Sequence, residues 1–138
     1  MSKPRLSLRH CLALVLLCAA ALAQAETPQQ ILSVYESAAR VQAPAFSASA
    51  VRGGDFFRNK HGREWSCASC HTGNPVDAGK HASTGKAIQP MAVAANAERF
   101  TQPNKVEKWF TRNCKDVLGR ECSAAEKADV VAFLSTVK

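Results

Sequence analysis

The stretch Cys67-Ala68-Ser69-Cys70-His71 decides the fold of this chain. It is a C-x-x-C-H sequence, the spacing with which a porphyrin is attached covalently to a protein. Two thiols three positions apart reach the two vinyl groups on one edge of the ring, and the next residue places an imidazole beneath the iron. The motif therefore predicts one covalent haem c, with Cys67 and Cys70 as thioethers and His71 as the proximal ligand.

The first 25 residues have the features of a secretory signal peptide. Three basic residues precede an uncharged apolar run from Cys11 to Ala23, and Ala23-Gln24-Ala25 is a small-x-small cleavage site. The apolar run is shorter than the roughly 20 residues of a membrane-spanning helix, and Leu17 before Cys18 does not suit a lipoprotein site. We expect an exported, periplasmic protein whose mature part, 26–138, is a single monohaem domain without a membrane span.

Charge and composition restrict the partners that the mature domain is expected to have. The whole chain carries a formal charge of +7, of which three charges belong to the signal peptide, so the mature domain carries +4. This moderate excess is compatible with docking on an acidic redox partner. The domain has no arginine-rich tract and no basic patch with interleaved aromatic residues, so no nucleic-acid partner is expected.

The cysteines outside the haem motif predict a disulfide. Six cysteines are encoded; Cys11 and Cys18 lie in the signal peptide, and two belong to the haem motif. Cys114 and Cys122 remain as an even pair in an oxidising compartment, where a disulfide is the default expectation. The bridge would close a loop of about nine residues and contribute about 2–3 kcal/mol on the loop-entropy model.

The remaining pattern is that of short helices separated by loops. Thr27-Pro28 predicts the start of a helix over 28–40, and residues 48–60 form a second candidate with Val51, Gly54 and Phe57 on one face. Residues 72–103 are expected to be mostly loop. A capping box of Asn104 with Glu107 predicts a helix from 104 to about 119, and one of Ser123 with Glu126 predicts a helix from 123 onward. In the second helix we expect a buried stripe of Val130, Leu134 and Val137, with Val131 and Phe133 beside it. The predicted architecture is all-α, with the layout of a class I cytochrome c.

The helix over 104–119 contains a candidate for the distal ligand of the iron. At helical spacing, Asn113 shares one face with four apolar residues, which are Val106, Trp109, Phe110 and Val117. A carboxamide that faces inward costs about 1–3 kcal/mol without a partner. Iron is one possible partner, while a backbone group near the helix end or a haem propionate is another.

Other side chains compete for the sixth position of the iron. Met91 follows Pro90 in the loop after the haem motif, where the methionine ligand of a plain electron carrier would lie. His81 lies in a polar loop that could cross the distal face. His61 is only six residues before Cys67, and this short connection keeps it on the proximal side.

Beyond the haem motif, three segments resemble the sphaeroides haem protein (SHP) family. They are Glu98-Arg99-Phe100-Thr101, the segment from Val106 to Cys114, and Val117-Leu118-Gly119-Arg120-Glu121-Cys122. The resemblance implies a small exported class I cytochrome c that binds diatomic ligands (O2, NO or CO). It also implies a dihaem cytochrome c as electron donor, which can be linked to a membrane cytochrome b. Residue by residue, it implies Asn113 as distal ligand, Cys114–Cys122 as disulfide and His71 as proximal ligand.

Three classes of function follow from these alternatives. The first is a ligand-binding cytochrome whose iron is reversibly capped by Asn113, and the second is an electron carrier with Met91 or a histidine as the cap. The third lacks haem and uses Cys67, Cys70 and His71 for zinc or for dithiol chemistry, but neither a second ligand pair nor a βαβ pattern supports it. We identify no general acid, general base or second redox centre, so no catalytic residue is named and enzymatic turnover is left undecided.

Overall fold

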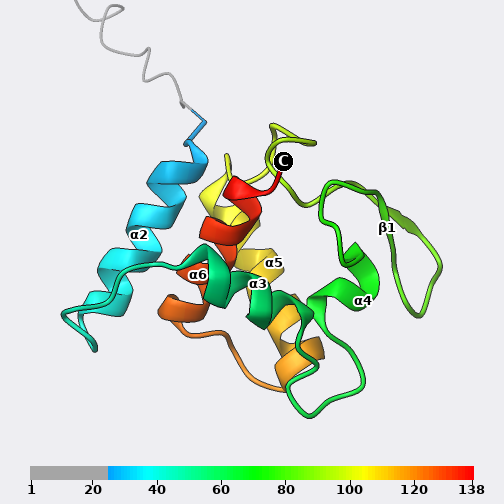
Figure 1. Ribbon diagram of the computed structural model, residues 1–138, viewed down its shortest axis with the longest axis horizontal. Helices are drawn as coiled ribbons and strands as arrows, with labels where there is room; N and C mark the ends of the chain where they lie inside the picture. Colours follow the sequence, from blue (N-terminus) through cyan, green and yellow to red (C-terminus); the bar gives the residue numbers. More distant parts are fainter. Residues whose placement is uncertain (1–24) are drawn as a thin grey trace, which may run out of the picture.

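The computed structural model describes residues 25–138, and the predicted signal peptide lies outside these residues except for Ala25. The described chain is almost entirely helical, as expected (Figure 1). Its helices are α2 (Pro28–Arg40), α3 (Ala50–Arg58), α4 (Cys67–His71), α5 (Pro103–Leu118) and α6 (Ala124–Thr136). A short antiparallel hairpin, β1 (Gly79–Lys80) and β2 (Ala87–Ile88), is the only sheet within this part.

The starts of α2 and α6 agree with their capping signals. The Thr27 hydroxyl accepts a hydrogen bond from the backbone N–H of Gln30, and Pro28 occupies the first turn of α2. Ser123 and Glu126 form the predicted capping box of α6. Each pair satisfies backbone N–H groups that have no partner within the helix, which is why these boundaries are visible in the local sequence.

The core is built where α6 packs against α2 and α3, in the middle of the molecule (Figure 1). Because α6 is covered on two sides, Val131 and Leu134 are fully buried, and Val130 and Phe133 are nearly so, while Val137 is only partly buried. Phe57 of α3 and Ile31 of α2 complete this centre. The predicted apolar stripe of α6 is thus confirmed, with burial extending around a wider part of the helix.

At the crossing of α3 and α6 the two backbones touch. A Cβ at Gly53 would overlap the carbonyl oxygen of Asp129, so only glycine fits there. The Asp129 carboxylate accepts hydrogen bonds from the Ser49 backbone N–H at 2.7 Å and from the Arg52 guanidinium at 2.8 Å. Of the three residues predicted to share one face of α3, Gly54 and Phe57 are buried, whereas Val51 is 75% exposed, because the close crossing turns Gly53 toward α6.

Candidate haem site

The residues of the C-x-x-C-H motif lie together on α4, a helix of little more than one turn. Cys67, Cys70 and His71 are all partly buried, and α4 lies on the side of the molecule opposite α2 (Figure 1). The Ser66 backbone N–H donates to the Ser69 hydroxyl at 3.0 Å, which closes the first turn. The helix therefore presents two sulfur atoms and one imidazole from five consecutive residues.

The β1–β2 hairpin packs against α4. A Cβ at Gly79 would overlap the Cys70 carbonyl oxygen, so the hairpin backbone lies directly on the motif. The Ala82 N–H donates to Cys70 Sγ at 3.3 Å. The His81 ring is occupied in the same hairpin, where its Nδ1 accepts from the N–H groups of Ser83 and Thr84. This arrangement holds His81 on the α4 side of the hairpin.

The His71 imidazole is the most informative side chain of the site. Its Nδ1 is buried without a hydrogen-bond partner, and no other buried side-chain nitrogen or oxygen in residues 25–138 lacks one. Burial, with the nearby Arg99 guanidinium, lowers the pKa of His71 to about 4, so the ring is neutral at pH 7. A neutral imidazole with an unpartnered buried nitrogen fits a metal ligand. The donor set and this orphaned atom both suit a covalently attached haem.

The thiol of Cys67 does not suit dithiol redox chemistry. Burial, together with the proximity of Cys70, raises the pKa of Cys67 to about 11. A redox-active thiol needs the opposite shift, because the thiolate is the reactive form. This favours the thioether role over the dithiol alternative.

Arg99 is a residue of the site that the sequence interpretation did not single out. Its guanidinium donates to the carbonyl oxygens of Pro90 and Gln89 at 2.8 and 2.7 Å, and burial lowers its pKa. It thereby fixes the backbone just before Met91. The feature of the sequence that could have identified Arg99 was its place in the Glu98–Thr101 segment, which is part of the family resemblance.

Met91 is tied to the segment that follows the haem motif. The backbone N–H groups of Met91 and Ala92 both donate to the Pro75 carbonyl oxygen at 2.9 Å. The Met91 side chain is partly buried and packs against the hydrophobic core. His61 makes only local contacts. Its ring centre lies 4.4 Å from that of Phe56, and its Nε2 lies 2.9 Å from the Phe56 carbonyl oxygen.

Asn113 lies on α5, which differs from the other long helices in how it is held. Whereas α6 packs closely on α2 and α3, α5 has no comparably close backbone packing with any described element. Besides the apolar contacts of its inner face, two side-chain links hold it. Glu107 accepts from Lys127 Nζ at 2.6 Å and from the Tyr35 hydroxyl at 3.0 Å, and Cys114 is joined to Cys122 by a disulfide.

The inner face of α5 is only partly as expected. Val117 is buried, Val106 and Phe110 pack on the core, and Asn113 is partly buried. The carboxamide of Asn113 makes no hydrogen bond with any residue in 25–138. Trp109 was expected inside but is 44% exposed, since it lies at the edge of this face beside the outward-facing cations.

The predicted capping box at the start of α5 is wrong. The helix begins at Pro103 after Gln102, and Glu107 does not reach back to Asn104, because its carboxylate is engaged by Lys127 and Tyr35. The predicted end of the helix is confirmed. Gly119 adopts φ 73° there, a conformation that favours glycine.

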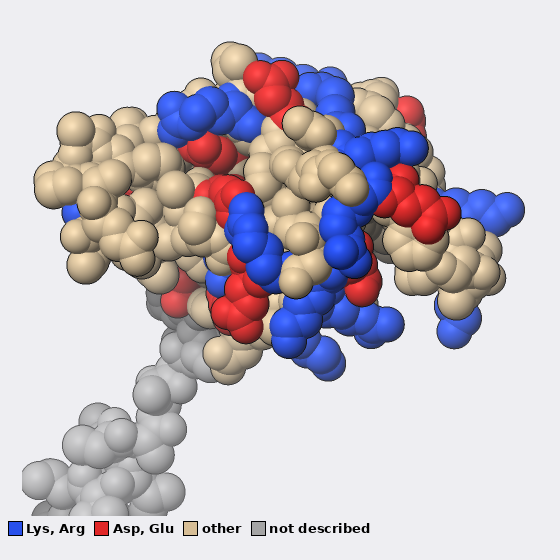
Figure 2. All heavy atoms as spheres, turned by 90° about the horizontal axis from the view of Figure 1, so that it is seen from below, with Lys and Arg blue, Asp and Glu red and all other residues tan. Residues whose placement is uncertain are grey.

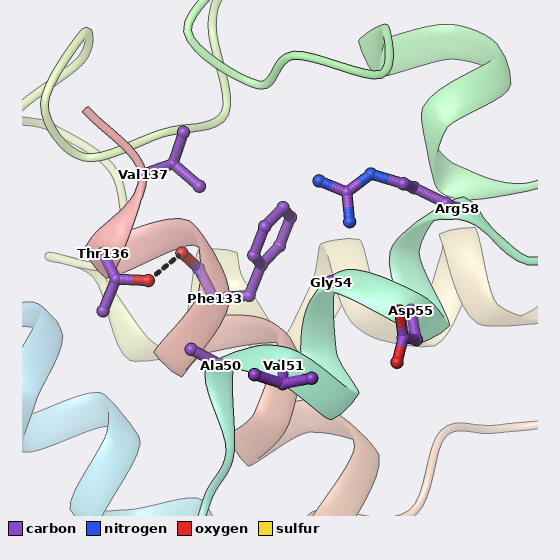
Figure 3. A pocket seen from close by; sticks show the side chains of 8 residues that line it. All are labelled: Ala50, Val51, Gly54, Asp55, Arg58, Phe133, Thr136 and Val137. Carbon is purple, nitrogen blue, oxygen red and sulfur yellow. Dashed lines mark hydrogen bonds between the residues drawn. The ribbon is translucent and has the colours of Figure 1, made fainter.

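One surface hollow of about 360 Å³ lies between α3 and α6 and is lined by Phe133 (Figure 3). The Arg58 guanidinium lies 5.0 Å from the centre of the Phe133 ring at its rim. None of the predicted site residues lines this hollow. It is therefore distinct from the haem-motif residues on α4.

Comparison with known proteins identifies the family of the chain. A family model described as "Domain of unknown function (DUF1924)" matches residues 43–134. The chain is 41% identical to cytochrome c'' of Methylophilus methylotrophus over 127 residues, which cover 88% of each protein. It is 40% identical over 118 residues to the cytochrome c-type protein SHP of Cereibacter sphaeroides, covering 83% of this chain and 88% of SHP. The chain belongs to the SHP family.

Solved structures support the fold of this SHP-family protein. Oxidised SHP, described as an oxygen-binding cytochrome c, has a TM-score of 0.72 at 39% identity and covers 80% of this chain and 97% of its own. Oxidised cytochrome c'' has a TM-score of 0.71 at 40% identity, with coverages of 80% and 94%. The solution structure of cytochrome c'', which addresses haem-ligand detachment, has a TM-score of 0.68 at 40% identity and covers 79% of this chain and 92% of its own. The all-α cytochrome c fold and the covalent haem c are thus confirmed.

Proposed function

We propose that this monohaem cytochrome c is exported to the periplasm, accepts electrons, and binds small diatomic ligands such as O2 or NO at an iron reversibly capped by Asn113. The observation that carries the proposal is the state of the Asn113 carboxamide. It is partly buried on the inner side of α5 and has no hydrogen-bond partner in residues 25–138. Because no group of the described chain engages this partly exposed amide, its oxygen is free to bind an iron atom held by His71.

The roles of the individual side chains follow from their chemistry. Cys67 and Cys70 would hold the haem through thioethers, and His71 would be the proximal ligand. The bound haem supplies an iron that changes between the ferric and ferrous states. Asn113 would offer a neutral amide oxygen, a hard donor that suits ferric better than ferrous iron. On reduction Asn113 would withdraw, and its NH2 group could donate a hydrogen bond to an incoming diatomic ligand.

Export rests on the signal-peptide pattern of residues 1–25, and the disulfide fits an oxidising compartment. Within residues 25–138, no helix combines the length and apolar composition needed to cross a membrane. The test is the mass of the protein purified from its native host. A mature chain beginning at Glu26, with no thiol free to react with an alkylating reagent, is expected; an uncleaved chain or two free thiols would contradict this.

The second candidate is a plain electron carrier with Met91 on the iron. Burial of Met91 near the core favours it, because a thioether ligand needs a dry apolar setting. Against it, the backbone of Met91 is fixed to Pro75, four residues beyond His71 in the chain. The proximal stretch thus restricts where Met91 can reach, whereas Asn113 comes from a separate helix.

Two variants of the holoprotein distinguish these candidates. Asn113→Ala removes the amide, and Met91→Leu removes the thioether while nearly conserving volume. We expect Asn113→Ala to change the ferric visible and electron paramagnetic resonance spectra and Met91→Leu to leave them unchanged, with the unmodified ferrous protein binding CO. The reverse pattern, with a ferrous form inert to CO, would establish the plain carrier.

The electron donor implied by the family resemblance is a dihaem cytochrome c. Whether the protein also turns over a ligand is tested by oxygen consumption with that donor kept reduced. Catalytic consumption that persists after many equivalents would establish a terminal oxidase activity. Uptake that stops after one equivalent per haem would establish binding without turnover.

A further inference from the structure

The outer face of α5 carries four cations in a single row. Lys105, Lys108, Arg112 and Lys115 are spaced three, four and three residues apart, so they share one side of the helix. All four are exposed, and none takes part in an ion pair within residues 25–138. We name these four residues the α5 basic row.

Elsewhere in the described chain, four cations are paired with acids, the first being Arg40 with Glu36, while others such as Lys60, Lys80 and Lys86 are exposed without an ion pair. Asp129 engages Arg52, Glu126 engages Arg120, and Glu107 engages Lys127. Glu107 belongs to α5 but points away from the row, toward α2 and α6. The charge of the row is therefore largely uncompensated, with Asp116 as the exposed acid nearest to it on the helix. Figure 2 shows blue side chains outnumbering red ones on the underside of the molecule.

Trp109 stands between the basic row and Asn113. Its side chain is 44% exposed, and the Arg112 guanidinium lies 5.8 Å from the centre of its ring. Asn113 lies one turn after Trp109. The exposed Trp109 ring therefore lies between the basic row and the side of α5 that carries Asn113. Tryptophan and arginine are the residue types that dominate binding energy at protein interfaces.

We infer that the α5 basic row and Trp109 form the docking surface for an acidic electron-transfer protein that reduces this cytochrome. The inference rests on the proposed function in two respects, that the haem accepts electrons from a protein donor and that Asn113 faces its iron. One electron leaves the donor, which is oxidised by one unit, and converts the ferric iron to ferrous. No proton or group is transferred.

The observations favour a protein over an anionic membrane. A helix that lies on a membrane places apolar side chains beside its cations, but Trp109 is the only large apolar residue that borders the row. The 16-residue helix is about 24 Å long, a length that matches one side of a standard protein interface. The same helix carries Asn113, so a donor docked on it would lie within one helix diameter of the proposed distal ligand.

The test is stopped-flow reduction of the ferric holoprotein by a reduced plant-type [2Fe–2S] ferredoxin, an acidic one-electron donor. Lys105→Glu combined with Lys108→Glu reverses the row near the start of α5, where acidic residues also favour the helix. Lys80→Glu with Lys86→Glu makes the same change of charge on the exposed β1–β2 hairpin beside α4. We expect at least about tenfold slower reduction for the α5 variant at low ionic strength and little change for the hairpin variant.

Raising the salt concentration should remove the difference, because exposed charges are screened. Reduction by dithionite should be complete in every variant; if it fails in the unmodified protein, the proposed electron-accepting function falls and not the docking surface. A loss confined to the hairpin variant, or equal rates in all three proteins, would overturn the inference. The inference would also be overturned if the unmodified protein sediments with phosphatidylglycerol vesicles and the α5 variant does not, while both are reduced at the same rate. The row would then be a membrane contact.

Discussion

Replacing Glu107 by Gln should loosen the attachment of α5 in a way that depends on pH. The carboxylate accepts hydrogen bonds from Lys127 at 2.6 Å and from Tyr35 at 3.0 Å, and it lies between α2, α5 and α6. Hydrogen bonds to a charged group are worth about 1.5–3 kcal/mol each when buried. The Lys127 side chain is 13% exposed but that of Glu107 is 50% exposed, so solvent screening reduces the total to about 1–2 kcal/mol.

The amide of Gln can still accept one of the two hydrogen bonds, so we expect Glu107→Gln to lower the free energy of unfolding by about 1 kcal/mol at pH 7. Burial alone would raise the pKa of Glu107, but the hydrogen bonds and the charge of Lys127 outweigh it and hold the pKa below its usual value. A carboxyl whose pKa is depressed on folding stabilises the protein above its unfolded pKa of about 4.3. That contribution is lost as the pH falls through the folded pKa.

The assay is urea unfolding of the holoprotein at pH 7 and at pH 3. The difference between the unmodified protein and Glu107→Gln should be about 1 kcal/mol at pH 7 and smaller at pH 3, because the contribution of a carboxyl with a lowered folded pKa begins to be lost below its unfolded pKa of about 4.3. Glu98→Gln is the control, since the exposed Glu98 carboxylate accepts no hydrogen bond within residues 25–138. A difference as large at pH 3 as at pH 7, or a control effect of equal size, would refute the reasoning.

Two further substitutions test how the helices are joined. In thermal melts, Gly53→Ala should destabilise the protein by about 1–3 kcal/mol, because the new Cβ overlaps the backbone of α6. Gly73→Ala is the control: its Cβ would have no atom within 4 Å, so stability should change by less than about 0.5 kcal/mol. Cys122→Ser should cost about 2–3 kcal/mol by removing the link to Cys114, and we expect it also to change the ferrous O2-binding rate if Asn113 moves during ligand exchange. An unchanged rate would leave the disulfide as a purely structural link.

The sequence was sufficient where the determining interaction is local. The cap of α2 at Thr27, the cap of α6 at Ser123 and the end of α5 at Gly119 depend on residues within one turn of each boundary. The spacing of Cys67, Cys70 and His71 likewise defines the haem attachment without reference to the rest of the fold. Such features can be predicted because their partners are neighbours in the chain.

The errors arose where a distant residue takes part. Glu107 was expected to cap α5, but Lys127, which is 20 residues away, engages it instead. Val51 was predicted only to share a face with Gly54 and Phe57; it is exposed while they are buried, because the contact of Gly53 with α6 sets the rotation of α3. Periodicity gives the angle between side chains on one helix and not the direction of the neighbouring helix. The role of Arg99 was also hidden, because its partners Gln89 and Pro90 are loop carbonyls without a sequence signature.

The two links of α5 restrict how Asn113 could act as an exchangeable ligand. Glu107 holds the helix 1.7 turns before Asn113, and Cys114 holds it directly after. A helix fixed at both positions cannot withdraw as a whole, although its backbone is not packed closely against another helix. If Asn113 leaves the iron on reduction, the movement must therefore be a rotation of its side chain or a small turn of residues 108–113 between the links. Breaking either link should widen the permitted movement, so Glu107→Gln and Cys122→Ser should alter ligand exchange in the same direction, whereas a rigid cap would respond to neither.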